Sequence, residues 1–149
     1  MEKLTTLDTI LNWKGRTVHS VAPDTTVFEA LKLMRDANVG ALLVLEAGRL
    51  VGIVSERDYA RKVAIEGRNS RTTPVREIIT PEPHTVPPTA TVNECMSLMT
   101  AQHIRHLPVL ETDRVVGVIS MGDLVKWVIQ AQSATIDQLQ SYISGSYPG

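Results

Sequence analysis

The sequence is poor in three features whose abundance would mark a particular class of protein. Only one of its 149 residues, Cys95, is a cysteine, which excludes an internal disulfide framework and fits a reducing compartment. Aromatic residues make up 4%, so the core must be built from aliphatic side chains. The 15 Lys and Arg residues do not exceed the 16 Asp and Glu residues, and without a surplus of cations we expect no nucleic-acid partner.

Long apolar runs are missing as well. No stretch approaches the roughly 18 apolar residues that span a bilayer, so we expect no membrane partner. Residues 1–13 interleave charged and polar residues with apolar ones and therefore lack the apolar core of a signal peptide. With 43% hydrophobic residues and a net charge of −1, the chain does not belong to the disordered class. These features predict a soluble, cytoplasmic protein.

The sequence does contain an internal repeat. At an offset of 65 residues, positions 19–58 align with positions 84–123 without a gap and share 17 identities in 40 positions. Ordinary composition would give roughly two or three identities by chance. The chain is therefore built from a duplicated unit.

Each copy predicts the same order of elements: an extended segment, an amphipathic helix, two strands joined by a short turn, and a second helix. The predicted strands are 41–45 and 50–54 in the first copy, and 107–110 and 115–119 in the second. Neither copy alone closes a large core. We therefore expect an α+β fold in which two β-α-β-β-α units pack around a pseudo-twofold axis.

The repeat also predicts the organisation of the whole chain. Residues 1–16 form a lead-in helix, 17–66 the first unit, 67–81 a linker with a brief helical turn, 82–132 the second unit, and 133–149 a terminal helix and tail. On the terminal helix one face is shared by Ile136, Leu139, Gln140 and Ile143.

Each copy closes on a motif of Gly, two aliphatic residues, Ser, two variable residues and Asp, over 52–58 and 117–123. In a structural interpretation, the serine caps the following helix and the aspartate complements its dipole. In a functional interpretation, amides, a hydroxyl and a carboxylate on one rim suit a phosphate or sugar oxygen and a vicinal diol. The residues alone leave both interpretations open and favour capping.

The duplicated unit with this closing motif resembles a pair of CBS domains, also called a Bateman module, over residues 17–128. Small stand-alone proteins with two CBS domains are most similar. The resemblance implies a non-catalytic regulatory protein that binds an adenosyl ligand, such as AMP, ADP, ATP, NAD or S-adenosylmethionine. It also implies a regulated protein that the sequence does not identify.

The resemblance assigns the ribose and the base of the ligand to particular residues. The ribose hydroxyls are bound by Asp58 and Asp123, with the hydroxyls of Ser55 and Ser120 beside them. The adenine slots are lined by Val18, His19, Ile53, His84 and Val118.

The resemblance assigns the phosphate to Arg105 and His106, with Arg57 in a supporting role. Each site takes its aspartate from one unit and its phosphate contacts from the other. Asp58 therefore shares a site with Arg105, whereas Asp123 faces Gly40 and Ala41, which carry no charge. We expect phosphorylated ligands to bind mainly at the Asp58 site.

Several alternatives stay open beside this assignment. Cations near a helix C-terminus are favourable in any case, and Arg57, Arg61 and Lys62 fit a solvated helix face. His103 and His106 lack a nearby carboxylate or thiol, so we expect no metal site. With no Ser-His-Asp grouping and no Walker loop, we expect no enzyme.

A protein-docking module with vestigial ligand sites, acting for example on a redox partner, is the alternative function. In either case we expect a homodimer, because the outer helices carry apolar residues that a monomer rarely leaves exposed. These residues are Val63, Val125, Val128 and Ile129.

Overall fold

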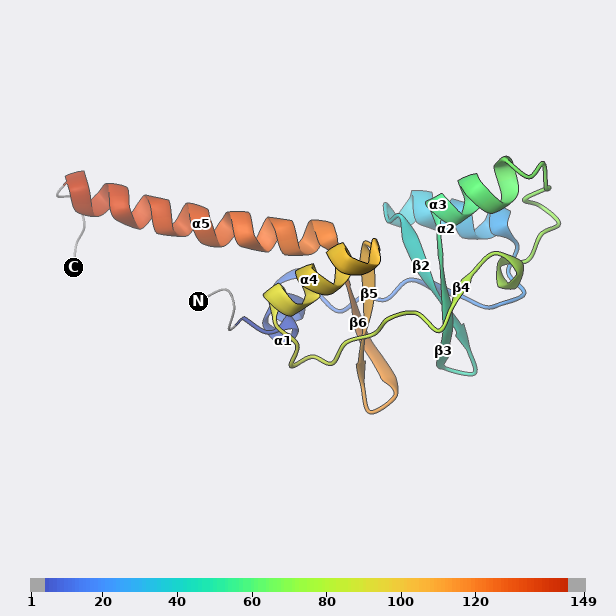
Figure 1. Cartoon of the computed structure of the whole chain (residues 1–149), viewed down its shortest axis with the longest axis horizontal. Coiled ribbons are helices and arrows are strands. Elements are labelled where there is room, and N and C mark those ends of the chain that lie inside the picture. The colour runs from blue at the N-terminus through green and yellow to red at the C-terminus, as the bar shows by residue number, and fades with distance from the viewer. Residues whose placement is uncertain (1–4, 145–149) are drawn as a thin grey trace.

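The structure is a computed structural model that describes the backbone of residues 5–144 and the side chains of residues 5–133 and 140. Two lobes lie side by side, with their strands toward each other and most helices on the outside (Figure 1). Strands β3 and β6 are in contact across the middle. The predicted α+β fold with two tandem units is confirmed.

The first lobe contains a four-stranded sheet. Strand β1 (Ser20–Val21) pairs in parallel with β2 (Ala41–Glu46), which is antiparallel to β3 (Arg49–Ser55), and β3 pairs with the short strand β4 (Thr80–Pro81). Helix α2 (Val27–Ala37) packs its buried residues on this sheet. The Thr26 hydroxyl accepts a hydrogen bond from the Glu29 amide and caps the helix.

The second lobe repeats the first at the predicted offset. Strand β5 (His106–Glu111) is antiparallel to β6 (Arg114–Ser120), and α4 (Val92–Gln102) occupies the place of α2. The two hairpins share the same irregularity, a register shift after Val44 and after Val109. Cys95 is fully buried on α4, and burial raises the pKa of its thiol to about 11.

The segments before each unit pack on the opposite lobe. Helix α1 (Leu7–Lys14), predicted as a lead-in helix, buries Leu7, Ile10 and Leu11 completely in the core of the second lobe. The 3-10 turn η3 (Val75–Glu77), predicted within the linker, buries Val75 in the core of the first. Each lobe is thus completed by the stretch of chain that leads into the other.

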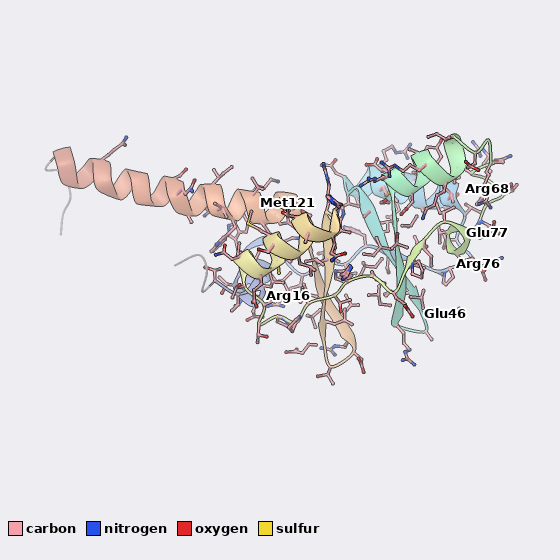
Figure 2. The ribbon with its side chains drawn as sticks, viewed as in Figure 1. Arg16, Glu46, Arg68, Arg76, Glu77 and Met121 are labelled. Carbon is pink, nitrogen blue, oxygen red and sulfur yellow. The ribbon has the colours of Figure 1, made fainter. Side chains whose placement is uncertain are left out.

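An ion pair joins the linker to the first lobe. Arg76 of the linker pairs with Asp24, and Arg68 pairs with Glu77 within the linker itself. Figure 2 shows Arg68, Arg76 and Glu77 together at the outer end of this lobe. The linker is therefore part of the folded unit and no mere spacer.

Two predictions about the helices are wrong. Helix α3 (Glu56–Tyr59) continues into a π-helical turn, η2 (Ala60–Ala64), which buries Val63 in the core, so that Val63 is not available for a dimer contact. The second unit has no separate terminal helix, because α5 (Met121–Ser144) is continuous and extends away from the body of the molecule (Figure 1). The side chains of Ile136, Leu139 and Ile143 lie outside the described residues. No helix among the described residues has the length and apolar character to cross a membrane.

Candidate functional site

Both closing motifs form capping boxes at the start of their helices. The Asp58 amide donates to Ser55 Oγ at 3.1 Å, and the Ser55 amide donates to Asp58 Oδ2 at 2.9 Å. The same pair of bonds joins Ser120 and Asp123, at 3.0 and 2.9 Å. The capping interpretation is therefore right. It leaves room for ligand binding, because each carboxylate has two oxygens and about four acceptor positions.

One cavity surrounds Asp58 and has a volume of about 1020 Å³. The first lobe contributes Ile53, Ser55, Arg57 and Asp58, and the segment from Thr80 to His84 closes one side. The second lobe contributes Arg105 and His106. The backbone of Arg105 is fixed in its own lobe, since its carbonyl accepts a hydrogen bond from the Met121 amide at 2.9 Å. The structure thus brings together the residues expected for this site.

A second cavity, of about 290 Å³, surrounds Asp123. It is lined on one side by Val118, Ser120 and Asp123, and on the other by Gly40 and Ala41. His19 is also part of its wall. The crossed arrangement of the two lobes is therefore present at both aspartates.

The two cavities share part of their walls. Gly40, Ile53 and His106 line both of them. Burial lowers the pKa of His106, and the charges of Lys14 and Arg105 act in the same direction, opposed by Asp123. A mostly neutral imidazole at this position keeps one nitrogen as a donor and one as an acceptor.

Two lysines that the sequence analysis did not place at the sites contact the aspartates. Lys62 Nζ lies 3.2 Å from Asp58 Oδ1, and Lys14 Nζ lies 2.8 Å from Asp123 Oδ2. Burial alone would raise the pKa of Asp123, but the hydrogen bonds from Lys14 and from Ser120 lower it below its ordinary value. Gly40 and Ala41 line the Asp123 cavity without charge, as expected, but Lys14 and Lys126 line it as well, so this site has cations that were not predicted.

Most predicted residues lie where they were expected, but one does not. Val18 lines neither cavity, whereas Pro83, its counterpart in the repeat, lines the Asp58 cavity. Arg61 and Lys62, interpreted as a solvated face, line the Asp58 cavity. The i, i+4 spacing of Asp58 and Lys62 could have revealed that ion pair, but nothing in the sequence pattern connects Lys14 with Asp123.

Within the part of the chain that the structure describes, no three His, Cys, Asp or Glu side chains lie together as ligands would.

The chain is similar to proteins with CBS domains over nearly its whole length. The family model of the CBS domain matches residues 15–65 and 75–130. A curated relative, CBS domain-containing protein CBSX3, mitochondrial, from Arabidopsis thaliana, is 38% identical over 96% of this chain and 74% of its own length. That name refers to mitochondria, and the cytoplasmic location of this chain stays a prediction.

Solved structures give the same result. A protein with CBS domains from Burkholderia ambifaria has a TM-score of 0.84 and 47% identity, over 86% of this chain and 96% of that one. The CBS domain protein PAE2072 from Pyrobaculum aerophilum, solved in complex with AMP, has a TM-score of 0.71 and 28% identity, over 79% of this chain and 88% of that one.

Proposed function

The chain belongs to the CBS-domain family and contains two CBS domains in tandem, and on this basis we propose that it is a non-catalytic nucleotide sensor. It binds an adenosine-containing nucleotide (AMP, ADP, ATP or NAD) between the two domains and transmits the bound state to a partner protein. The observation that carries the proposal is the joint lining of one cavity by Asp58 of the first domain and by Arg105 and His106 of the second. The AMP complex of a related CBS protein supports the choice of ligand.

The chemistry of the Asp58 cavity suits the three parts of a nucleotide. The Asp58 carboxylate, whose side chain is 13% exposed, accepts two hydrogen bonds from Ser55 at Oδ2 and faces Lys62 at Oδ1, which keeps one acceptor position for a ribose hydroxyl. Ile53 and His84 offer an apolar face and a flat ring to adenine. Arg105 carries a permanent charge, and an arginine contact to phosphate is among the stronger hydrogen bonds in proteins.

A nucleotide in this cavity would bridge the two domains. Its ribose would be held by one domain and its phosphate by the other, so its affinity depends on their relative position. A ligand shifts a conformational equilibrium only by its differential affinity for the two states. A bridging ligand satisfies this condition, and the partner would recognise the arrangement that the ligand favours.

The proposal is tested by thermal melting against AMP, ADP, ATP, NAD, NADH and S-adenosylmethionine. A ligand that binds only the folded state raises the free energy of unfolding by mass action, by about 2.7 kcal/mol at 100 times its Kd. The melting temperature rises accordingly. We expect at least one of these ligands to stabilise the wild type and to stabilise Asp58→Ala less. A flat response to the whole panel would contradict the proposal.

A protein-docking module is the second candidate. The observation in its favour is the exposed apolar pair Val125 and Ile129 on α5, at 40% and 56% exposure. This candidate predicts the flat response to nucleotides, together with loss of partner binding when these two side chains are replaced by charged ones.

A further inference from the structure

The ammonium group of Lys14 occupies the Asp123 cavity from within the chain. Lys14 Nζ donates a hydrogen bond of 2.8 Å to the carbonyl of Val118 and lies 2.8 Å from Asp123 Oδ2. Val118 belongs to the strand end expected to face adenine, and Asp123 is the expected ribose acceptor. One cation therefore contacts an acceptor at each end of the nucleoside part of this site, at Asp123 through the oxygen that also accepts from the Ser120 amide.

The corresponding lysine of the other cavity is arranged differently. Lys62 also bridges an aspartate and a carbonyl, at 3.2 Å from Asp58 Oδ1 and 3.0 Å from the Ile78 oxygen. Ile78, however, is buried in the core of the first lobe and does not line the cavity. Ile53, the counterpart of Val118, is paired with Thr80 of β4 and has no lysine hydrogen bond. Within the described residues, the Asp123 cavity is therefore the one in which a single lysine contacts both the ribose-site aspartate and the carbonyl of the adenine-facing strand end.

The base of the Lys14 side chain is fixed, whereas its end can move. Helix α1 is anchored by the complete burial of Leu7, Ile10 and Leu11, which holds the Lys14 backbone at the cavity rim. Lysine has a flexible four-carbon stem, and the Lys14 side chain is 26% exposed. Displacement of the ammonium from Asp123 therefore requires a rotamer change and no movement of the helix.

The cost of that displacement depends on the ligand. A nucleoside without phosphate would break the contacts of Lys14 with Asp123 and Val118 and offer the ammonium no anion in return. A phosphorylated nucleoside would provide such an anion. Gly40 and Ala41 offer no charge to a phosphate beside them, whereas Lys14, in the same cavity, can pair with it.

We infer that Lys14 makes the Asp123 cavity selective for phosphorylated nucleosides, by competing with the nucleoside for Asp123 and Val118 and by pairing with the phosphate once displaced. This inference rests on the proposed function, since it takes nucleotides as the ligands. It changes the expected difference between the sites: the Asp58 cavity accepts adenosine and AMP, and the Asp123 cavity accepts AMP only.

The test uses full-length chain carrying Asp58→Ala, so that only the Asp123 cavity is intact, and measures AMP and adenosine binding by calorimetry. With Lys14→Met added, we expect adenosine to bind about tenfold more tightly and AMP more weakly, so that the ratio of AMP to adenosine affinity falls by more than about tenfold. Lys14→Arg keeps the cation and should retain most of the ratio. Lys14→Gln, which removes the charge with a smaller change in polarity, should behave as Lys14→Met does, and both variants are checked for folding by their melting temperatures.

Lys126→Met is the matched control. Lys126 lines the same cavity, but within the described residues it forms no hydrogen bond or ion pair with Asp123 or Val118, in contrast to Lys14. Its removal lowers the positive charge equally and should weaken AMP without strengthening adenosine. The gain in adenosine affinity is therefore specific to Lys14.

Two results would overturn the inference, and they are distinguishable. If AMP binds to the Asp58→Ala chain and Lys14→Met leaves the affinity ratio unchanged, the inference is wrong and the proposed function stands. If neither AMP nor adenosine binds to the wild-type chain in either cavity, both the inference and nucleotide sensing through AMP are wrong.

Discussion

Asp58 and Arg105 belong to different CBS domains and line the same cavity. If Arg105 holds the phosphate there, Arg105→Ala should weaken AMP at the Asp58 site by about 1.5–3 kcal/mol, the range for a hydrogen bond to a charged group. Adenosine, which has no phosphate, should bind nearly as before. Calorimetric titration of AMP and adenosine against wild type and variant separates these effects. Equal losses for both ligands would show that Arg105 supports the fold and does not contact phosphate.

The two aspartates should matter separately. Asp58→Asn and Asp123→Asn each keep an oxygen that accepts the capping hydrogen bond of Ser55 or Ser120, but they remove the charge that the ribose hydroxyls would meet. Each should weaken nucleotide binding at its own site by about 1.5–3 kcal/mol. Their effect on stability should be smaller than that of the alanine variants, which lose the capping-box hydrogen bond to the Ser55 or Ser120 amide. Unchanged affinity at both sites would refute the ribose assignment.

Because each lobe packs against the segment that leads into the other, two glycine-to-alanine substitutions should lower the free energy of unfolding. A Cβ on Gly117 would lie 2.6 Å from Leu11 Cδ2, and one on Gly52 would lie 2.8 Å from Ile79 Cδ1 and 2.9 Å from the Thr80 oxygen. Gly117→Ala and Gly52→Ala should each reduce the free energy of unfolding by about 1–3 kcal/mol. Gly52→Ala should cost more, because the Thr80 backbone cannot rotate away.

Gly122→Ala is the control for this pair. Its Cβ would meet no atom closer than 3.6 Å, and alanine in a helix is favoured over glycine by up to about 1 kcal/mol. Urea denaturation of the three variants gives the comparison. A Gly117→Ala chain as stable as the wild type would mean that α1 does not pack against β6.

Much of this architecture could be predicted from the repeat, because the repeat reflects local structure. Turn, cap and strand residues act over a few positions, so the same residues at an offset of 65 give the same elements, down to the left-handed caps Asn38 and His103, with φ of 57° and 56°. The sequence pattern also brought Asp58 and Arg105 into one site, but only through the resemblance to a family. No local rule links two residues from different units.

Of the features that were not predicted, the most consequential depends on contacts between distant segments. The destination of α1 was missed because amphipathicity shows that a helix has an apolar face but not which core receives it. The position of Lys14 at the Asp123 cavity follows from the packing of α1 on the second lobe. Val63 was expected on an outer face, but the π-helical turn of η2 changes the helical phase and directs it into the core.

The buried position of His106 predicts a dependence of stability on pH. Burial lowers its pKa below the ordinary value of 6.5, so the unfolded chain binds more protons than the folded chain between the two pKa values. Stability from this residue is therefore present above about pH 6.5 and falls as the pH drops toward the folded-state pKa. His106→Gln should lose less stability than the wild type between about pH 7.5 and about pH 5.5, as measured by thermal melting. Equal losses would contradict this role for His106.

The exposed face of α5 predicts self-association. Val125 and Ile129 are 40% and 56% exposed and four residues apart, so they lie on the same side of the helix. With Val63 in the core, these two are the residues expected to form the contact, while Val128 packs against the second lobe. A closed twofold dimer is the commonest way to cover such a face.

Light scattering tests this directly. The wild type should have a mass of about twice the 16.4 kDa of one chain at micromolar concentration, and Ile129→Asp should shift it toward the monomer, because a charge buried in an apolar contact is strongly unfavourable. Ile65→Asp is the matched control, since Ile65 is 76% exposed and directly follows η2 of the first lobe, and should leave the mass unchanged. A wild-type mass near 16.4 kDa would refute the dimer. A dimer that both variants retain would place the contact on a surface other than α5.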